Sequence, residues 1–163
     1  MSPPRVLFVC TGNICRSPAA HAVLVTAARR AGVPVVVDSA GLGGWHAGEL
    51  PDPRAIAEGA GRGYVLDHPA RKVRPTDFAA FDLILAMDRT HLRGLAALAP
   101  APVDHLVLFR TFDPTPGAPD VADPYYDGDA AFVEMFDVIE AAMPRLVARV
   151  GEIGGHVTRP STL

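Results

Sequence analysis

Hydrophobic positions along the chain switch between short apolar runs and helical stripes. The run Val-Leu-Phe-Val at 6–9 is too brief for a helix, and it predicts a buried strand over residues 5–9. Ser17 and Pro18 then provide an N-cap hydroxyl and a proline at the first helical position. Small and apolar residues recur at three- and four-residue spacing over 20–31, and Gly32 ends the pattern. The chain therefore begins with a strand, a loop and an amphipathic helix.

The same alternation continues to about residue 150. Apolar runs predict further strands, and amphipathic stripes predict further helices, separated near the end by a Pro- and Gly-rich loop over 113–127. The predicted strands are 35–37, 83–87 and 106–109, and the predicted helices are 53–60, one after Arg89, and one carrying Phe132, Phe136, Ile139, Met143 and Leu146. This order predicts an α/β fold, a three-layer sandwich with a four-stranded parallel sheet flanked by helices.

Parallel sheets place their functional sites at the carboxyl ends of their strands. Four chemically useful residues are expected there: Cys10, Ser39, Asp88 and Asp113. Asp88 is also the expected cap of the helix that follows it.

Composition narrows the classes of function. A length of 163 residues suits one domain over 1–163, with a core of about 4–150 and a tail of about 151–163. Lys and Arg number 15 and Asp and Glu 18, which gives a net charge of −3 without long charge runs and argues against nucleic acid as a partner. No apolar run is long enough to cross a membrane and no signal-peptide pattern is present, so we expect a cytoplasmic protein, with signal-less export left open.

The segment from Cys10 to Ser17 carries the chemistry. A cysteine and an arginine separated by five residues can surround one tetrahedral anion if the backbone between them turns its N–H groups inward, and Gly12 and Asn13 tolerate the positive φ that this requires. The following helix points its positive end at the same place. The predicted phosphate-binding residues are Thr11, Gly12, Asn13, Ile14, Cys15, Arg16 and Ser17.

This environment favours a nucleophilic cysteine. A helix N-terminus and a nearby arginine stabilise a thiolate, so Cys10 should be largely ionised near neutral pH. The planar guanidinium of Arg16 matches two phosphoryl oxygens at once. We therefore predict phosphoryl transfer to sulfur followed by hydrolysis, with no metal or cofactor, because the sequence has no His/Cys cluster at zinc spacing and no dense carboxylate loop.

Four segments resemble a known family. The decapeptide VCTGNICRSP at 9–18 is similar to the signature of the low-molecular-weight protein tyrosine phosphatases. DPYY at 123–126 resembles the general-acid motif of that family, DSAG at 38–41 its second-strand motif, and GWH at 44–46 a feature of bacterial members. Chain length and the order of elements agree over about 4–150.

The resemblance implies a protein tyrosine phosphatase that works through a cysteinyl-phosphate intermediate. Cys10 would be the nucleophile, Arg16 the phosphate clamp and Asp123 the general acid and base. Asp-Pro is also common in ordinary turns, but Pro124 biases Asp123 toward an extended backbone, which can hold its carboxyl group outward for proton transfer.

Further residues take supporting roles under the same resemblance, although each could also be an ordinary core or surface residue. Trp45 and Tyr125 would flank a phenyl phosphate, with Tyr126 and His46 at the rim. Asn13, Ser39 and His68 would shape the loop through hydrogen bonds, and the Ser17 hydroxyl would support the thiolate. Expected partners are phosphotyrosine proteins, phosphate and vanadate as ligands, and a tyrosine kinase acting on Tyr125 or Tyr126.

Cys15 has two readings that the sequence leaves open. It either packs at the base of the loop or forms a reversible disulfide with oxidised Cys10.

Three other functions are compatible with parts of this pattern. An arsenate reductase uses a similar loop but needs further cysteines, and Cys15 is the last cysteine of this chain. Protein arginine phosphatases resemble this loop with Thr where Ile14 stands. A non-catalytic phosphate-binding module would not need a nucleophile, a clamp and an acid together.

Overall fold

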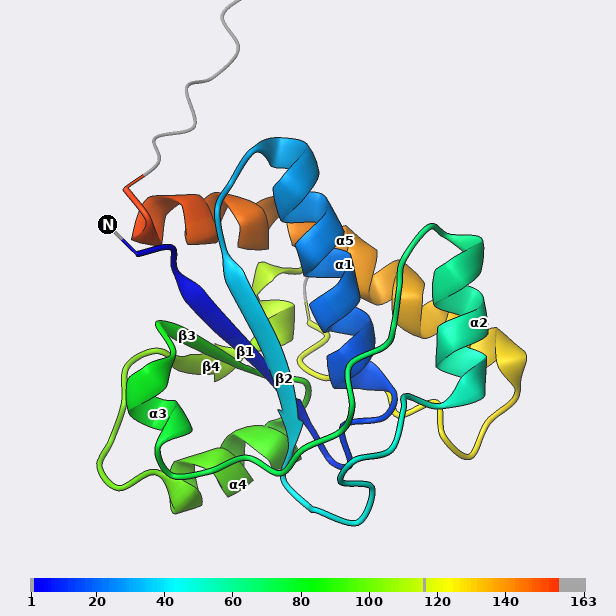
Figure 1. Cartoon of the computed structure of the whole chain (residues 1–163), viewed down its shortest axis with the longest axis horizontal. Coiled ribbons are helices and arrows are strands. Elements are labelled where there is room, and N and C mark those ends of the chain that lie inside the picture. The colour runs from blue at the N-terminus through cyan, green and yellow to red at the C-terminus, as the bar shows by residue number, and fades with distance from the viewer. Residues whose placement is uncertain (1, 116, 156–163) are drawn as a thin grey trace, which may run out of the picture.

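The sheet has four parallel strands in the order β2-β1-β3-β4 (Figure 1). The computed structural model describes residues 2–115 and 117–155. The strands are β1 (Arg5–Cys10), β2 (Val36–Gly41), β3 (Leu83–Ala86) and β4 (Leu106–Leu108). The predicted four-stranded parallel sheet is confirmed.

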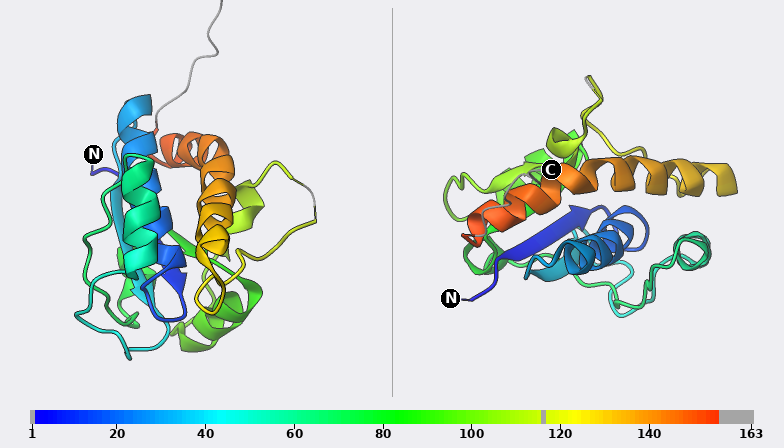
Figure 2. Two further views of the ribbon diagram at one scale, coloured as in Figure 1. Left: turned by 90° about the vertical axis from the view of Figure 1, so that its right-hand side faces the viewer. Right: turned by 90° about the horizontal axis from the view of Figure 1, so that it is seen from above.

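Helices cover both faces of the sheet, which completes the predicted three layers (Figure 2). Helices α1, α2 and α5 lie on one face, and α3 and α4 lie on the other. The helices are α1 (Arg16–Ala31), α2 (Pro53–Gly61), α3 (Asp77–Ala80), α4 (Arg89–Leu98) and α5 (Asp129–Ile153), with a 3₁₀ turn η1 (Phe109–Phe112) after β4. In the described part of the chain, no helix is both long enough and apolar enough to span a membrane.

Strand β1 is the centre of the core because its side chains are buried on both faces of the sheet. Val6 and Phe8 pack into the cluster beneath α1 and α5, whereas Leu7 and Val9 pack into the cluster on the α4 side. All four side chains are fully buried. A continuous apolar run is the pattern expected of such a strand.

Several boundaries differ from the predictions. Strand β2 extends through the polar segment 38–41, because these residues pair in register with 7–10 of β1. Helix α5 continues to Ile153, so residues 151–153 belong to the helix and not to the expected tail. The rest of that tail from 156 onward lies outside the described residues. The short α3 and η1 were not predicted, since each has only four residues.

Only part of the predicted strand-end cluster forms. Cys10 ends β1, and Asp88 follows β3 and caps α4 by accepting a hydrogen bond from the His91 N–H. The prediction was wrong for Ser39, which lies inside β2 because that strand runs to Gly41. It was also wrong for Asp113, whose carboxylate is held 2.7 Å from Arg110 after η1.

Candidate active site

The loop between β1 and α1 is held open by bonds on its outer side. The carbonyl oxygens of Cys10, Thr11 and Ile14 accept hydrogen bonds from the backbone of Leu42, Gly43 and Asp52, respectively, at 2.8–3.0 Å. In a trans peptide the next N–H points the opposite way from the carbonyl. Three amides, those of residues 11, 12 and 15, therefore face the inside of the loop, where they can bind an anion.

Asn13 fixes the shape of this loop. Its φ of 60° makes it the one non-glycine residue with positive φ among the described residues. Its side chain is almost fully buried, and the Oδ1 atom accepts a hydrogen bond from the Arg71 N–H while the Nδ2 group donates to Ser17 Oγ. These bonds offset the strain of the left-handed backbone.

The Cys10 thiol lies at the bottom of the pocket with one polar neighbour close by. Its Sγ atom is 3.0 Å from Ser17 Oγ, and both side chains are buried. Because Asn13 donates to Ser17 Oγ at 2.7 Å, the Ser17 hydroxyl proton can be directed to sulfur. Ser17 is not the N-cap as predicted: α1 begins at Arg16, two residues before Pro18, and Cys15 occupies the cap position. The Ser17 side chain turns to the thiol instead.

Arg16 is clamped on one side and open on the other. Its Nη1 group donates to Asp88 Oδ2 and to the Val121 carbonyl, both at 2.9 Å, and the side chain is only 5 % exposed. Its Nη2 group lies 3.7 Å from Asp123 Oδ2. The guanidinium is therefore held in one orientation beside Cys10, with Nη2 facing the Asp123 carboxyl group.

His91 is a residue of the site that sequence reasoning missed. Its Nε2 atom lies 2.8 Å from Thr11 Oγ1 and 3.5 Å from Arg16 Nη2, and its Nδ1 atom lies 3.2 Å from Asp88 Oδ1. Burial, with the positive charge of Arg16, lowers the pKa of His91 to about 4. A neutral ring can accept a hydrogen bond at Nε2, so His91 supports the loop without adding charge.

Asp123 reaches the pocket from the loop before α5. Its Oδ1 atom accepts a hydrogen bond from the Tyr125 N–H at 3.1 Å, and the carboxyl group remains 45 % exposed. Arg54 secures the same loop, because its guanidinium donates to the carbonyl oxygens of Tyr125 and Asp127 at 2.9 and 3.0 Å. This role of Arg54, which also pairs with Asp52, could not be seen in the sequence.

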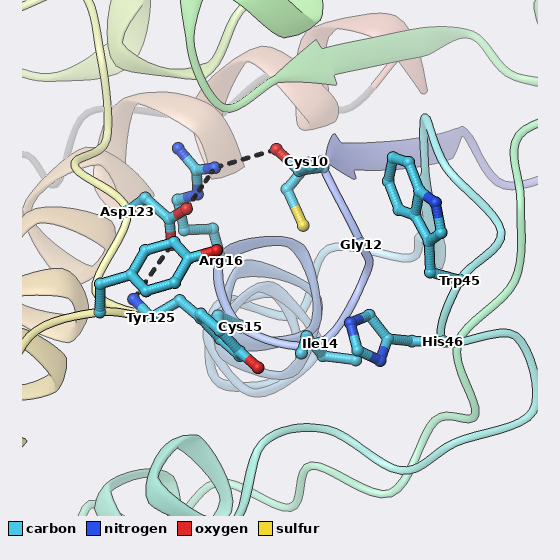
Figure 3. Close-up of a pocket in the computed structure, with 11 residues that line it drawn as sticks. Cys10, Gly12, Ile14, Cys15, Arg16, Trp45, His46, Asp123 and Tyr125 are labelled. Atoms are coloured by element: carbon cyan, nitrogen blue, oxygen red, sulfur yellow. Dashed lines mark hydrogen bonds and ion pairs between the residues drawn. The ribbon is translucent and has the colours of Figure 1, made fainter.

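A cavity of about 280 Å³ opens above Cys10. Figure 3 shows the sulfur pointing into it, with Arg16 and Asp123 on one side and Trp45 on the other. Tyr125 and the strongly exposed Tyr126 also line it, as does His46. The structure thus brings together the predicted nucleophile, clamp, acid and rim residues: Cys10, Thr11, Gly12, Ile14, Cys15, Arg16, Trp45, His46, Asp123, Tyr125 and Tyr126.

Glycine at position 43 is needed to form the aromatic wall. A Cβ atom there would lie 1.8 Å from the Trp45 ring, so the ring can pack over this backbone only because the side chain is absent.

Cys15 is buried at the base of the pocket and has a free thiol. Burial, together with the negative charge of Asp52, raises the pKa of Cys15 far above its usual value. This thiol is therefore protonated at neutral pH.

Two predicted supporting residues lie one step away from the loop. Ser39 Oγ is 3.2 Å from His21 Nδ1, and His68 Nε2 is 2.8 Å from Asp38 Oδ1, so neither bonds directly to the phosphate loop. Burial and the neighbouring His68 lower the pKa of His21 to about 4.

Comparison with known proteins agrees with this geometry. Residues 5–154 match the family model described as low molecular weight phosphotyrosine protein phosphatase. A low molecular weight protein-tyrosine-phosphatase of Streptomyces coelicolor is 49% identical over 154 residues, covering 91% of this chain and 94% of the relative.

Solved structures share the fold as well. A protein tyrosine phosphatase from Entamoeba histolytica, with Hepes in the active site, has a TM-score of 0.88 and 36% identity, covering 91% of this chain and 97% of the other. The YwlE arginine phosphatase, in a mutant form with a phosphorylated active site serine, has a TM-score of 0.83 and 27% identity, covering 91% and 96%.

Proposed function

The chain belongs to the low molecular weight phosphotyrosine protein phosphatase family, and on that basis we propose that Cys10 attacks the phosphoryl group, Arg16 holds it and Asp123 protonates the departing phenol. The activity of this family, hydrolysis of phosphotyrosine, is the activity of this protein. The observation that carries the residue assignments is the arrangement of these three side chains around one cavity.

The first step transfers the phosphoryl group to sulfur. The Cys10 thiolate attacks phosphorus in line, the S–P bond forms, and the bond from phosphorus to the phenolic oxygen breaks. The inward amides of the loop and the open side of Arg16 stabilise the charge on the equatorial oxygens. The Ser17 hydroxyl, 3.0 Å from sulfur, stabilises the thiolate before attack and after release.

Asp123 acts in both steps. Its carboxyl group donates a proton to the phenolate as that group leaves, and the resulting carboxylate then takes a proton from the water that attacks the cysteinyl phosphate. Its Oδ2 atom is 3.7 Å from Arg16 Nη2, which places the proton donor beside the clamp. Neither of these two reaction steps requires a cofactor.

The pocket walls favour an aryl phosphate. Trp45 stands on one side and Tyr125 on the other, so their rings can flank a phenyl group. Ile14 adds an apolar side chain to the same lining. These contacts distinguish the proposed substrate from phosphoarginine, the substrate class implied by the name of the YwlE neighbour.

The direct test compares three substrates without added metal: p-nitrophenyl phosphate, a phosphotyrosine peptide and a phosphoarginine peptide. We expect hydrolysis of the first two, inhibition by vanadate, and complete loss of activity in the Cys10→Ser variant. Activity that survives this substitution would contradict the assignment of the nucleophile, and a preference for phosphoarginine would contradict the assignment of the substrate.

Protein partners follow from the same site. A folded Asp123→Ala variant should retain the phosphate loop but turn over slowly, so it is suited to trapping phosphotyrosine proteins. Tyr126, which is 89 % exposed, is the better candidate for a partner tyrosine kinase, and phosphopeptide mapping after incubation with such a kinase tests this.

Cys15 is proposed as a redox partner of Cys10. Both cysteines are free and line the same cavity. Peroxide can oxidise Cys10 to a sulfenic acid, which then condenses with the Cys15 thiol, so that the S–S bond forms and the hydroxyl group leaves with the thiol proton as water. Peroxide treatment followed by mass spectrometry should detect the Cys10–Cys15 crosslink, and failure to find it would leave Cys15 a packing residue.

A further inference from the structure

A second cluster of chemically active side chains lies outside the pocket. His21 comes from α1, Asp38 from β2 and His68 from the segment that follows α2 (Figure 1). One ligand atom from each lies within 4.8 Å of the other two. This cluster could not be predicted from the sequence, because the fold brings together residues from three separate elements.

The donor set is typical of a transition-metal site. Two imidazoles and one carboxylate suit zinc, cobalt or nickel, whereas calcium and magnesium prefer oxygen ligands alone. In tetrahedral zinc sites ligand atoms are about 3.4 Å apart, as follows from bond lengths near 2.1 Å. The three ligand atoms must therefore move closer together to bind one ion. Small rotations of the three half-buried side chains can achieve this.

A proton now occupies the position that a cation would take. His68 Nε2 lies 2.8 Å from Asp38 Oδ1, and this contact requires a shared proton. The other ring nitrogen, His68 Nδ1, is buried without a hydrogen-bond partner among the described residues. The His21 and His68 rings are in contact, with centroids 5.0 Å apart.

The surrounding charges favour a cation. Arg71 pairs with Asp38 at 3.0 Å, but the same guanidinium also pairs with Asp77 at 2.9 Å. Two carboxylates and one guanidinium leave a net charge of −1 beside the two histidines. The His68 and Asp38 side chains are 31 % and 27 % exposed, so a cation can reach them from solvent.

We propose that His21, Asp38 and His68 form a binding site for one divalent transition metal of the zinc and cobalt class. Binding displaces the proton shared by Asp38 and His68 into solvent and leaves one coordination position for water. The site is separate from the phosphatase chemistry, in which none of the three side chains takes part.

Cobalt(II) is the best probe, because its spectrum identifies its ligands. Titration of the protein at micromolar concentration should give one equivalent of bound Co²⁺ with visible d–d absorption. It should not give the near-ultraviolet band of sulfur-to-cobalt charge transfer, which would reveal binding to Cys10 or Cys15 instead. Zinc should displace the cobalt.

Variants locate the site. His21→Gln and His68→Gln should each weaken Co²⁺ binding at least about ten-fold, since each removes one of three protein ligands. His46→Gln is the matched control, because His46 pairs with Glu49 in a different exposed His–carboxylate pair 2.6 Å apart. This variant should bind Co²⁺ as the parent protein does.

A measurement on the unaltered protein keeps the proposal testable if a variant does not fold. Paramagnetic shifts of histidine ring signals on adding Co²⁺ should identify two histidines at the ion. Absence of stoichiometric binding, wild-type affinity in folded His21→Gln and His68→Gln, thiolate charge transfer, or shifts confined to other histidines would each overturn the proposal.

Discussion

Replacing Asp123 with Ala tests the central chemical assignment, because it should affect substrates unequally. A positioned general acid contributes about 10²–10⁴-fold to rate. The Asp123 carboxyl group is 45 % exposed, so water can partly take its place, and we expect the lower part of that range. The kcat for a phosphotyrosine peptide should therefore fall about 10²–10³-fold, equivalent to about 3–4 kcal/mol of activation free energy.

An ester with an acidic leaving group needs less help from a proton donor. For p-nitrophenyl phosphate we expect the kcat of the same variant to fall about ten-fold or less, because p-nitrophenolate leaves as a stable anion. Steady-state kinetics on both substrates measure the two ratios. Asp127→Ala, which removes a carboxylate from the same loop, is the control and should change both rates less than about two-fold.

The interpretation would fail if Asp123→Ala slowed both substrates equally. Such a result would mean that Asp123 acts by holding Arg16, from which it is 3.7 Å away, and not by proton transfer. The affinity for inorganic phosphate separates these cases, since loss of the proton donor alone leaves phosphate binding to the loop intact.

Three further predictions follow from the contacts around the site. In the Arg54→Lys variant the lysine cannot bond both carbonyl oxygens as the planar guanidinium does, so kcat for phosphotyrosine should fall several-fold. If Arg54 acts by placing Asp123, the same substitution should lower kcat little further in the Asp123→Ala variant. Asp88→Asn removes the negative charge 2.9 Å from buried Arg16, so the midpoint of urea unfolding should fall. Added phosphate should restore part of the lost stability. The free energy of unfolding, measured by urea titration, should fall less between about pH 6.5 and pH 4 in the His91→Gln variant than in the parent protein. In that window the unfolded state protonates this histidine near its ordinary pKa while the folded state, with its pKa lowered to about 4, does not.

The loop at 10–17 could be predicted from the sequence because its determinants are local. The strand before it, the glycine and asparagine within it and the helix after it all lie inside one short segment, and the structure has them in that order. The helix start was misplaced by two residues because the N-cap preference of Ser17 was weaker than the bond of its hydroxyl to Asn13.

The supports of the site could not be predicted, because they depend on contacts between distant segments. Asp88 was expected as a helix cap, which it is, but its ion pair with Arg16 joins residues 72 positions apart. His91 meets Thr11 across 80 positions, and Arg54 meets the Tyr125 carbonyl across 71. Nothing in the local sequence of these residues distinguishes them from ordinary helix residues.

The segment between β2 and β3 has two functions that the loop signature does not reveal. Its backbone N–H groups at Leu42, Gly43 and Asp52 bind the outer carbonyls of the phosphate loop, and that of Arg71 binds Asn13. These bonds keep the inner amides oriented before any anion arrives, so little reorganisation is needed during catalysis.

The same segment also forms one wall of the pocket, through Trp45 and His46. Its backbone therefore sets the geometry of phosphate binding while its side chains contact the rest of the substrate. Substitutions of these side chains that leave the backbone bonds intact should alter substrate preference more than they alter phosphate affinity. A Gly43→Ala change should affect both, because the Trp45 ring can then no longer pack over a backbone N–H that holds the loop.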